Sequence, residues 1–196
     1  MVGKEIWITN FENKNNLVEV TKEYYIQIFL DKVEEIFSFN EDDEIEEILS
    51  LADNITFNSF SQWERFKLKT QKANVSAGIR VNPESSTVET DLYNPCGRYS
   101  RLGVTLKEFK PDLLDGIEGL HFHALCEQNA DALESVLQEF EKKFSKWIPQ
   151  MKWINFGGGH HITRKDYDVE KLASKVKKII ANDSMYRNVN AINMLR

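Results

Sequence analysis

The chain has 196 residues, of which 41% are hydrophobic and 29% are charged, a balance typical of a soluble globular protein. Its formal net charge of -6 argues against nucleic acid as a partner, and no apolar run reaches transmembrane length, so we expect no membrane partner either. The first ten residues lack the apolar centre of a signal peptide, and Cys96 and Cys126 are too few for a disulfide framework. We therefore expect a cytoplasmic location.

The hydrophobic pattern predicts strands that alternate with helices. The expected strands are Lys4–Thr9, Ile55–Asn58, Val75–Val81, Ile117–His123 and Lys152–Phe156. The expected helices are Leu17–Phe39, Glu41–Leu51, Ser59–Lys72 (capped by Ser59 or Ser61), Asn129–Trp147 and Val169–Ile180. A long loop, Asn82–Ser100, is of a length that is usually functional or disordered, and no pattern is found after Asp183. This order predicts a parallel sheet with helices outside it.

Several polar or glycine residues follow the expected strands. Parallel sheets bind ligands at the carboxyl ends of their strands. Such ends carry Asn58, Arg80, His123 and Gly157, so we expect one shared site.

Three consecutive glycines, Gly157, Gly158 and Gly159, end the last of these strands. Each glycine costs conformational entropy, and a tight turn needs one of them, rarely three. The run therefore favours backbone amides that wrap an anion, most often a phosphate.

All four histidines lie near these strand ends, and His121 and His123 point the same way because they alternate along a strand. One interpretation is a metal site made by His121, His123, Cys126 and the His160–His161 pair, as in a metal-dependent barrel hydrolase. The other is that one histidine stacks on a flat cofactor ring while the glycines hold its phosphate. His121 is also compatible with a plain core residue.

Several motifs, taken together, resemble one enzyme family. They occupy Phe57–Phe66, Gly78–Glu84, Val88–Cys96, Ser100–Val104, Gly116–Glu134 (with HFHALCEQN) and Lys152–Glu170 (with NFGGGHHITR). The chain resembles carboxynorspermidine (carboxyspermidine) decarboxylases over about Asp42–Asp183. These pyridoxal 5'-phosphate enzymes are related to ornithine and diaminopimelate decarboxylases and, more distantly, to alanine racemase.

The resemblance implies an α/β fold: a partial (β/α)8 TIM-type barrel that binds pyridoxal phosphate and holds about five of the eight strands of such barrels. It divides the chain into a divergent segment at 1–40, the partial barrel at 41–183 and a non-matching tail at 184–196. The full-length family enzyme is a homodimer.

The resemblance also assigns roles to residues. His123 would stack on the pyridine ring, and Gly157, Gly158 and Gly159 would wrap the phosphate. Cys126 stands where relatives carry a phosphate-binding serine, and Arg80 would lie near the phenolic oxygen of the cofactor. The implied reaction is loss of an α-carboxylate as CO2 from a small cationic polyamine with an amino-acid end, a step of polyamine biosynthesis.

One expected part is not found in the sequence. The family's Schiff-base lysine lies on the first barrel strand in a run like A-L-K-x-F, and the nearest look-alike, Thr105–Phe109, follows SRLG in the wrong element. The later barrel strands and the β domain are also not matched. We therefore expect an internal fragment without decarboxylase activity, either a partial decarboxylase or a non-catalytic cofactor-binding remnant.

Overall fold

A computed structural model describes residues 41–88, 93–160, 162, 164–174 and 190–192. Its strands are β1 (Asn54–Phe57), β2 (Ser76–Arg80), β3 (Ile117–His121), β4 (Trp153–Asn155) and β5 (Asn190–Ile192). Its helices are α2 (Glu41–Leu51), α3 (Phe60–Ala73) and α4 (Ala130–Phe144), with short 3-10 turns at Leu106–Glu108, Pro111–Leu113 and Ile148–Gln150. Residues 169–174 are also helical.

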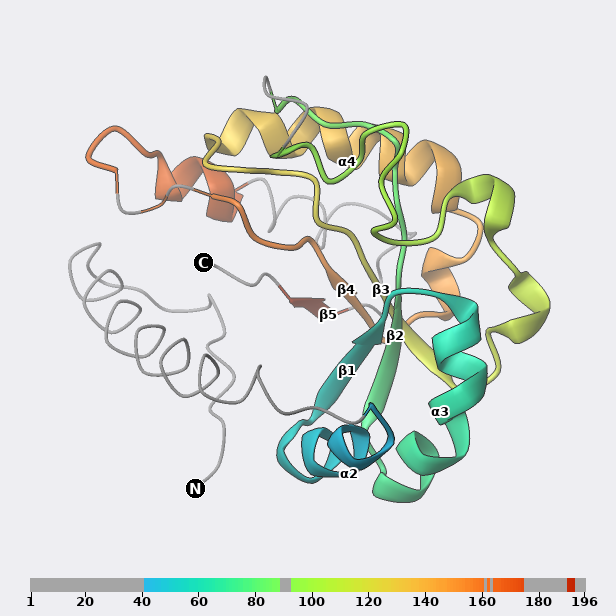
Figure 1. The fold of residues 1–196 in the computed structure, drawn as a ribbon. Coiled ribbons are helices and arrows are strands. Elements are labelled where there is room, and N and C mark those ends of the chain that lie inside the picture. Colours follow the sequence, from blue (N-terminus) through green and yellow to red (C-terminus); the bar gives the residue numbers. More distant parts are fainter. Residues whose placement is uncertain (1–40, 89–92, 161, 163, 175–189, 193–196) are drawn as a thin grey trace.

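The five strands form one sheet in the order β1-β2-β3-β4-β5, and every neighbouring pair is parallel (Figure 1). Four predicted strands and the helices at α2, α3 and α4 are confirmed within a few residues. The strand β5 was not predicted, because its three residues carry no hydrophobic alternation of their own. The expected strand Lys4–Thr9 and helix Leu17–Phe39 lie outside the described residues, as does the end of the helix expected after Val169.

Helix α3 begins and ends where its sequence provides caps. The side chain of Ser59 accepts a hydrogen bond from the amide of Gln62, and Asn74 closes the helix in the left-handed conformation at φ 57°. The buried side chains Trp63 and Phe66 follow helical spacing and place α3 against β1 and β2 (Figure 1).

One face of the sheet packs against the helices. Ile79, Leu120 and Ile154 are register neighbours on β2, β3 and β4, and all three are fully buried. Just beyond β3, the ring of Phe122 packs on Phe140 of α4 at 4.8 Å between centroids. Burial of this apolar layer is the main source of stability that the described residues offer.

The opposite face carries the indole of Trp153, which lies over two glycines. Gly78, Gly119 and Trp153 are aligned across β2, β3 and β4, and the indole Nε1 donates to the hydroxyl of Ser76 at 2.8 Å. That hydroxyl donates in turn to Glu118 at 2.6 Å. Trp153 therefore fills this face one row below the carboxyl edge of the sheet.

None of the helices in the described ranges combines the length and the apolar character that crossing a lipid bilayer requires.

Replacement of Gly119 by alanine should test this packing. A Cβ at Gly119 would lie 2.2 Å from the ring of Trp153, so Gly119→Ala should lower the free energy of unfolding by about 1–3 kcal/mol. Urea unfolding measures the change. Gly97→Ala is the matched control, because its Cβ would meet nothing closer than 3.4 Å. Equal stability of the two variants would contradict this account of the Trp153 face.

Candidate functional site

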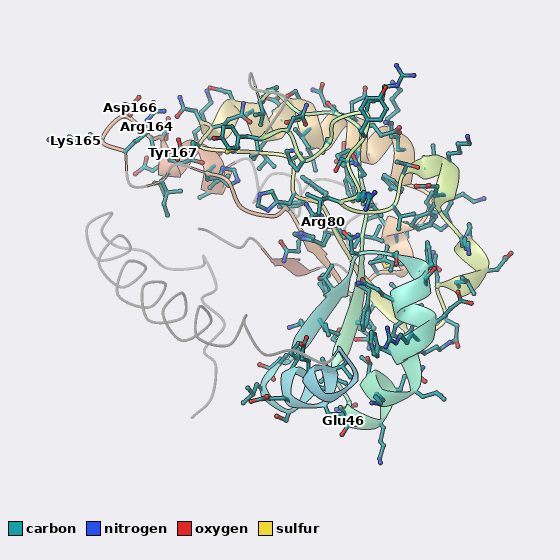
Figure 2. All side chains as sticks on the ribbon, viewed as in Figure 1. Glu46, Arg80, Arg164, Lys165, Asp166 and Tyr167 are labelled. Atoms are coloured by element: carbon teal, nitrogen blue, oxygen red, sulfur yellow. The ribbon has the colours of Figure 1, made fainter. Side chains whose placement is uncertain are left out.

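A row of polar side chains lies directly above Trp153, at the carboxyl edge of the sheet. Arg80, His121 and Asn155 are register neighbours on β2, β3 and β4, so they project to the same face. His121 and Asn155 are each 7% exposed, and Arg80 is partly exposed at the end of β2 (Figure 2). Of the residues expected at this edge, Arg80 belongs to this row, and His121 and Asn155 lie beside it.

The segments that follow β3 and β4 continue side by side beyond the sheet. The amide of Phe122 donates to the carbonyl of Asn155 at 3.0 Å, and that of Gln128 donates to the carbonyl of Gly159 at 3.0 Å. Between these bonds, the amide of Gly158 points to Nδ1 of His123 at 3.4 Å. His123 and the glycine run are thus brought together, as the motifs indicate.

Packing alone accounts for two of the three glycines. Gly157 and Gly159 have φ values of +72° and +85°, and a Cβ at these positions would lie 2.4 Å from the carbonyl oxygen of Phe122 and 2.0 Å from that of Leu125. These two glycines are therefore required by the fold without any ligand, because the neighbouring backbone leaves no room for a side chain. The Gly157 amide is already used within the protein, because it donates to Oδ1 of Asn155 at 2.8 Å. A phosphate interpretation therefore rests on the amides of Gly158 and Gly159 and on their surroundings instead of on the glycine count.

Two buried imidazoles flank His123. Burial lowers the pKa of His121 to about 4, helped by the charge of Arg80 and opposed by a hydrogen bond with Asn155. Burial also lowers the pKa of His160 to about 4, with a smaller contribution from His123. Both imidazoles are therefore neutral at pH 7, and within the described residues Nδ1 of His121 and Nε2 of His160 have no hydrogen-bond partner.

The two cysteines differ in their exposure to solvent. Residues 122–128 form the strip that follows β3 and runs beside the glycine run. Cys126, expected at a phosphate, is exposed on this strip. Cys96 is buried in the long loop, with its Sγ 4.0 Å from the carbonyl oxygen of His123. Burial raises the pKa of the Cys96 thiol to about 11, opposed by the nearby charge of Arg80, so the thiol stays protonated. The length of the loop and the motif Val88–Cys96 are the two sequence signals for this residue.

The loop that holds Cys96 covers the strip after β3. The hydroxyl of Ser86 donates to the carbonyl of Ala124 at 2.6 Å, and the side-chain amide of Gln128 donates to the carbonyl of Thr87 at 2.6 Å. The described part of Asn82–Ser100 therefore packs on the site, and a functional rather than free loop is the better interpretation of its length.

Other candidates at the strand ends have structural roles. The side chain of Asn58 donates to the carbonyl of Arg101 and accepts from the amide of Gly103, both at 2.8 Å. It therefore fastens the SRLG turn instead of facing a ligand, and Arg101 is exposed. Lys107, in the run that resembles the lysine motif, is exposed on a 3-10 turn outside the sheet.

No group of three or more histidine, cysteine, aspartate or glutamate side chains is placed to hold a metal ion among the residues that the structure describes. His161, one of the ligands considered, lies outside those residues. The metal-dependent alternative gains no support from the described part.

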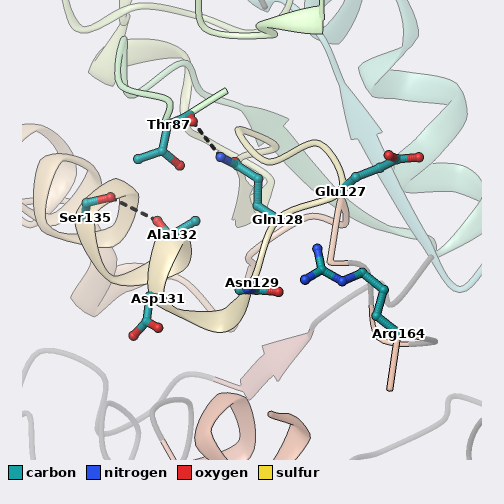
Figure 3. Close-up of a pocket in the computed structure, with 8 residues that line it drawn as sticks. All are labelled: Thr87, Glu127, Gln128, Asn129, Asp131, Ala132, Ser135 and Arg164. Carbon is teal, nitrogen blue, oxygen red and sulfur yellow. Dashed lines mark hydrogen bonds between the residues drawn. The ribbon is translucent and has the colours of Figure 1, made fainter. Parts of the chain in front are cut away.

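An open hollow lies on the outer side of the strip, against the start of α4 (Figure 3). It is lined by Thr87, Glu127, Gln128, Asn129, Asp131, Ala132, Ser135 and Arg164. None of these residues belongs to the polar row or the glycine run, so the hollow is not the site that the motifs indicate.

The neutral histidines make the stability pH-dependent. An unfolded histidine has a pKa near 6.5, so between about pH 6.5 and 4 the unfolded chain binds protons that folded His121 and His160 do not. The contribution of these histidines to the free energy of unfolding should therefore be largest above pH 6.5. It should fall on acidification by about 3 kcal/mol per histidine between pH 6.5 and 4.

Urea unfolding between pH 7.5 and 5 measures this slope, because the carboxylate of Glu118, whose pKa is lowered by its hydrogen bond with Lys152, takes up its proton only at lower pH. The double variant His121→Gln, His160→Gln should show a flatter slope. An unchanged slope in the double variant would contradict the burial of neutral imidazoles.

Comparisons with known proteins bear on this arrangement, although no family model matches the chain. A carboxynorspermidine/carboxyspermidine decarboxylase from Campylobacter jejuni is 61% identical over 136 residues, which are 69% of this chain and 35% of that protein. A carboxyaminopropylagmatine decarboxylase from Synechocystis is 46% identical over 128 residues, 65% of this chain and 33% of that protein.

A solved structure supports the same fold. The crystal structure of carboxynorspermidine decarboxylase from Campylobacter jejuni, complexed with norspermidine, superposes with a TM-score of 0.67 at 52% identity, covering 81% of this chain and 38% of the other. The expected fold, part of a decarboxylase β/α barrel, is confirmed. The chain spans about a third of the length of the curated relatives it matches. The resemblance drawn from the motifs is also confirmed: over most of its length this chain is similar in sequence and fold to carboxynorspermidine/carboxyspermidine decarboxylases.

Proposed function

We propose that residues 41–183 form part of the cofactor site of a pyridoxal-phosphate-dependent decarboxylase. The enzyme would remove the α-carboxylate of carboxynorspermidine or carboxyspermidine as CO2. The observation that carries the proposal is the joint position of His123 and the glycine run beside Arg80, in a segment that is 61% identical to a decarboxylase of that name.

The residues present fit such a cofactor. The Gly158 amide has only a long bond of 3.4 Å to His123, so it is available to a stronger acceptor such as a phosphate oxygen. His121 and His160 each keep a buried ring nitrogen that finds no hydrogen-bond partner among the described residues, which is unusual in a protein core. Arg80 supplies a cation at the same edge, suited to a phenolate oxygen.

Each residue has a distinct proposed part. His123 would lie against the pyridine ring. The glycine run would wrap the phosphate with the amides of Gly158 and Gly159, since the amide of Gly157 donates to Asn155 at 2.8 Å. Cys126 would approach the same phosphate from the neighbouring strip. When bound, pyridoxal phosphate supplies the electron sink for the broken carbon–carbon bond.

The surrounding groups keep the site low in charge. His121 and His160 are neutral at pH 7, and the Cys96 thiol is protonated. Arg80 is then the one cation of the polar row, and burial lowers its pKa without discharging it at pH 7. A single guanidinium at this edge would orient the cofactor by its phenolic oxygen.

The substrate class follows from the relatives. Two of them are named for carboxylated polyamine substrates, and the solved structure holds norspermidine. A small cationic polyamine with an amino-acid end is therefore the proposed substrate, and a cytoplasmic homodimer of the full-length enzyme is the proposed setting. Non-catalytic cofactor binding is the second candidate for this chain, because Lys107 of the lysine-like run is exposed on a turn away from the site.

Absorbance titration with pyridoxal phosphate tests the proposed site. His123→Ala and Arg80→Ala should each weaken binding about tenfold or more, because each removes a direct contact. Arg98→Ala is the matched control, since that guanidinium is exposed and lies over the ring of Tyr99 at 5.6 Å. Failure of the unmodified protein to bind would contradict the proposal.

The same sample distinguishes catalysis from binding. Borohydride reduction followed by mass spectrometry should find no lysine adduct in the 196-residue chain, and incubation with carboxynorspermidine should release no CO2. A reducible adduct or turnover would show that one of its lysines does take the catalytic place.

A further inference from the structure

A buried histidine–tyrosine pair follows the glycine run and has no part in the roles assigned above. His160 is 1% exposed and Tyr167 is 2% exposed. The tyrosine hydroxyl and Nδ1 of His160 are 2.7 Å apart, and the two rings meet edge to face at 89°. Tyr167 lies on the segment that leads to helical residues 169–174 (Figure 2), and this contact fastens that segment onto the end of the glycine run.

The backbone around His160 is fixed from the other side as well. His160 is bridged to Gln128, and the amide of Gln128 donates to the carbonyl of Gly159. His160 is therefore held at two points: its backbone by the bridge to Gln128, and its imidazole by the hydroxyl of Tyr167. A side chain held this firmly is pre-organised for whatever its second nitrogen contacts.

That second nitrogen is the unexplained feature. Nε2 of His160 is buried and has no hydrogen-bond partner among the described residues. A neutral imidazole has one N–H donor and one acceptor nitrogen, so a donor bond from Tyr167 to Nδ1 leaves the proton on Nε2. Burial keeps the ring neutral by lowering its pKa to about 4, with His123 close enough to add to the effect.

We propose that Tyr167 holds His160 in the tautomer protonated on Nε2, and that this N–H donates a hydrogen bond to the phosphate group of the bound cofactor. The inference rests on the proposed function, since it needs a phosphate ester beside the glycine run. His160 then adds a neutral side-chain donor to the backbone amides. Tyr167 acts through His160 and is a positioning residue.

Paired ligands isolate the phosphate contact. The dissociation constants of pyridoxal phosphate and of pyridoxal, which lacks the phosphate, are measured for the unmodified protein and its variants. His160→Asn keeps a polar atom near the Nδ1 position but none near Nε2. It should therefore weaken the binding of pyridoxal phosphate roughly ten- to hundredfold and leave the binding of pyridoxal unchanged. His160→Gln, with an amide nitrogen near the Nε2 position, should recover most of the loss.

Tyr167→Phe tests the positioning role. This variant should weaken the binding of pyridoxal phosphate by less than His160→Asn does. It should also reduce the share of the Nε2-protonated tautomer, which is measured from the 15N chemical shifts of the labelled His160 ring. Tyr99→Phe is the matched control, because that side chain is 87% exposed. If the variants do not fold, the 15N chemical shift of His160 in the unmodified protein still tests the contact. This shift should change when pyridoxal phosphate is added and stay constant when pyridoxal is added.

The outcomes separate the two proposals. No binding of pyridoxal phosphate by the unmodified protein overturns the proposed function, and this inference with it. Binding that His160→Asn leaves unchanged, or weakens equally for both ligands, overturns the inference alone and assigns the pair a structural role.

Discussion

The site depends on the parallel alignment of β3 with β4, which continues past the ends of both strands. Because the strands run in the same direction, the chain leaves both of them at one edge, and the segments after them stay hydrogen-bonded from Phe122 to Gln128. Glycines at 157 and 159 permit this approach, since their neighbours' carbonyl oxygens leave no space for a Cβ. Without that contact, His123 and the amide of Gly158 would not meet.

Burial then sets the charges at this edge. The indole of Trp153 fills the sheet face beneath the row of Arg80, His121 and Asn155. The described part of the Asn82–Ser100 loop covers the strip after β3. Two histidines and one thiol consequently stay neutral around the guanidinium of Arg80. The proposed anionic ligand would be bound at this site through directed N–H groups and one cation instead of a high net positive charge, which is compatible with a chain of net charge -6.

Local patterns predicted much of the fold. Amphipathic spacing, the cap at Ser59 and short apolar runs located three helices and four strands because each of these signals lies within a few neighbouring residues. The strand β5 was not predicted from the sequence, because a segment of three residues forms a strand only where the edge of a neighbouring strand, here β4, provides hydrogen-bond partners. The sequence likewise does not reveal why Gly157 and Gly159 are glycines, because the backbone that crowds them lies 35 and 34 residues earlier in the chain, at Phe122 and Leu125.

The sequence by itself determined the motif residues and the family resemblance, because both are properties of residue order that survive without coordinates. Only the tertiary structure decided which residues meet. It buried Cys96 beside His123, left Cys126 exposed, and paired His160 with Tyr167. The physical reason is that burial and partner geometry arise from contacts between segments far apart in the chain, which no local pattern encodes.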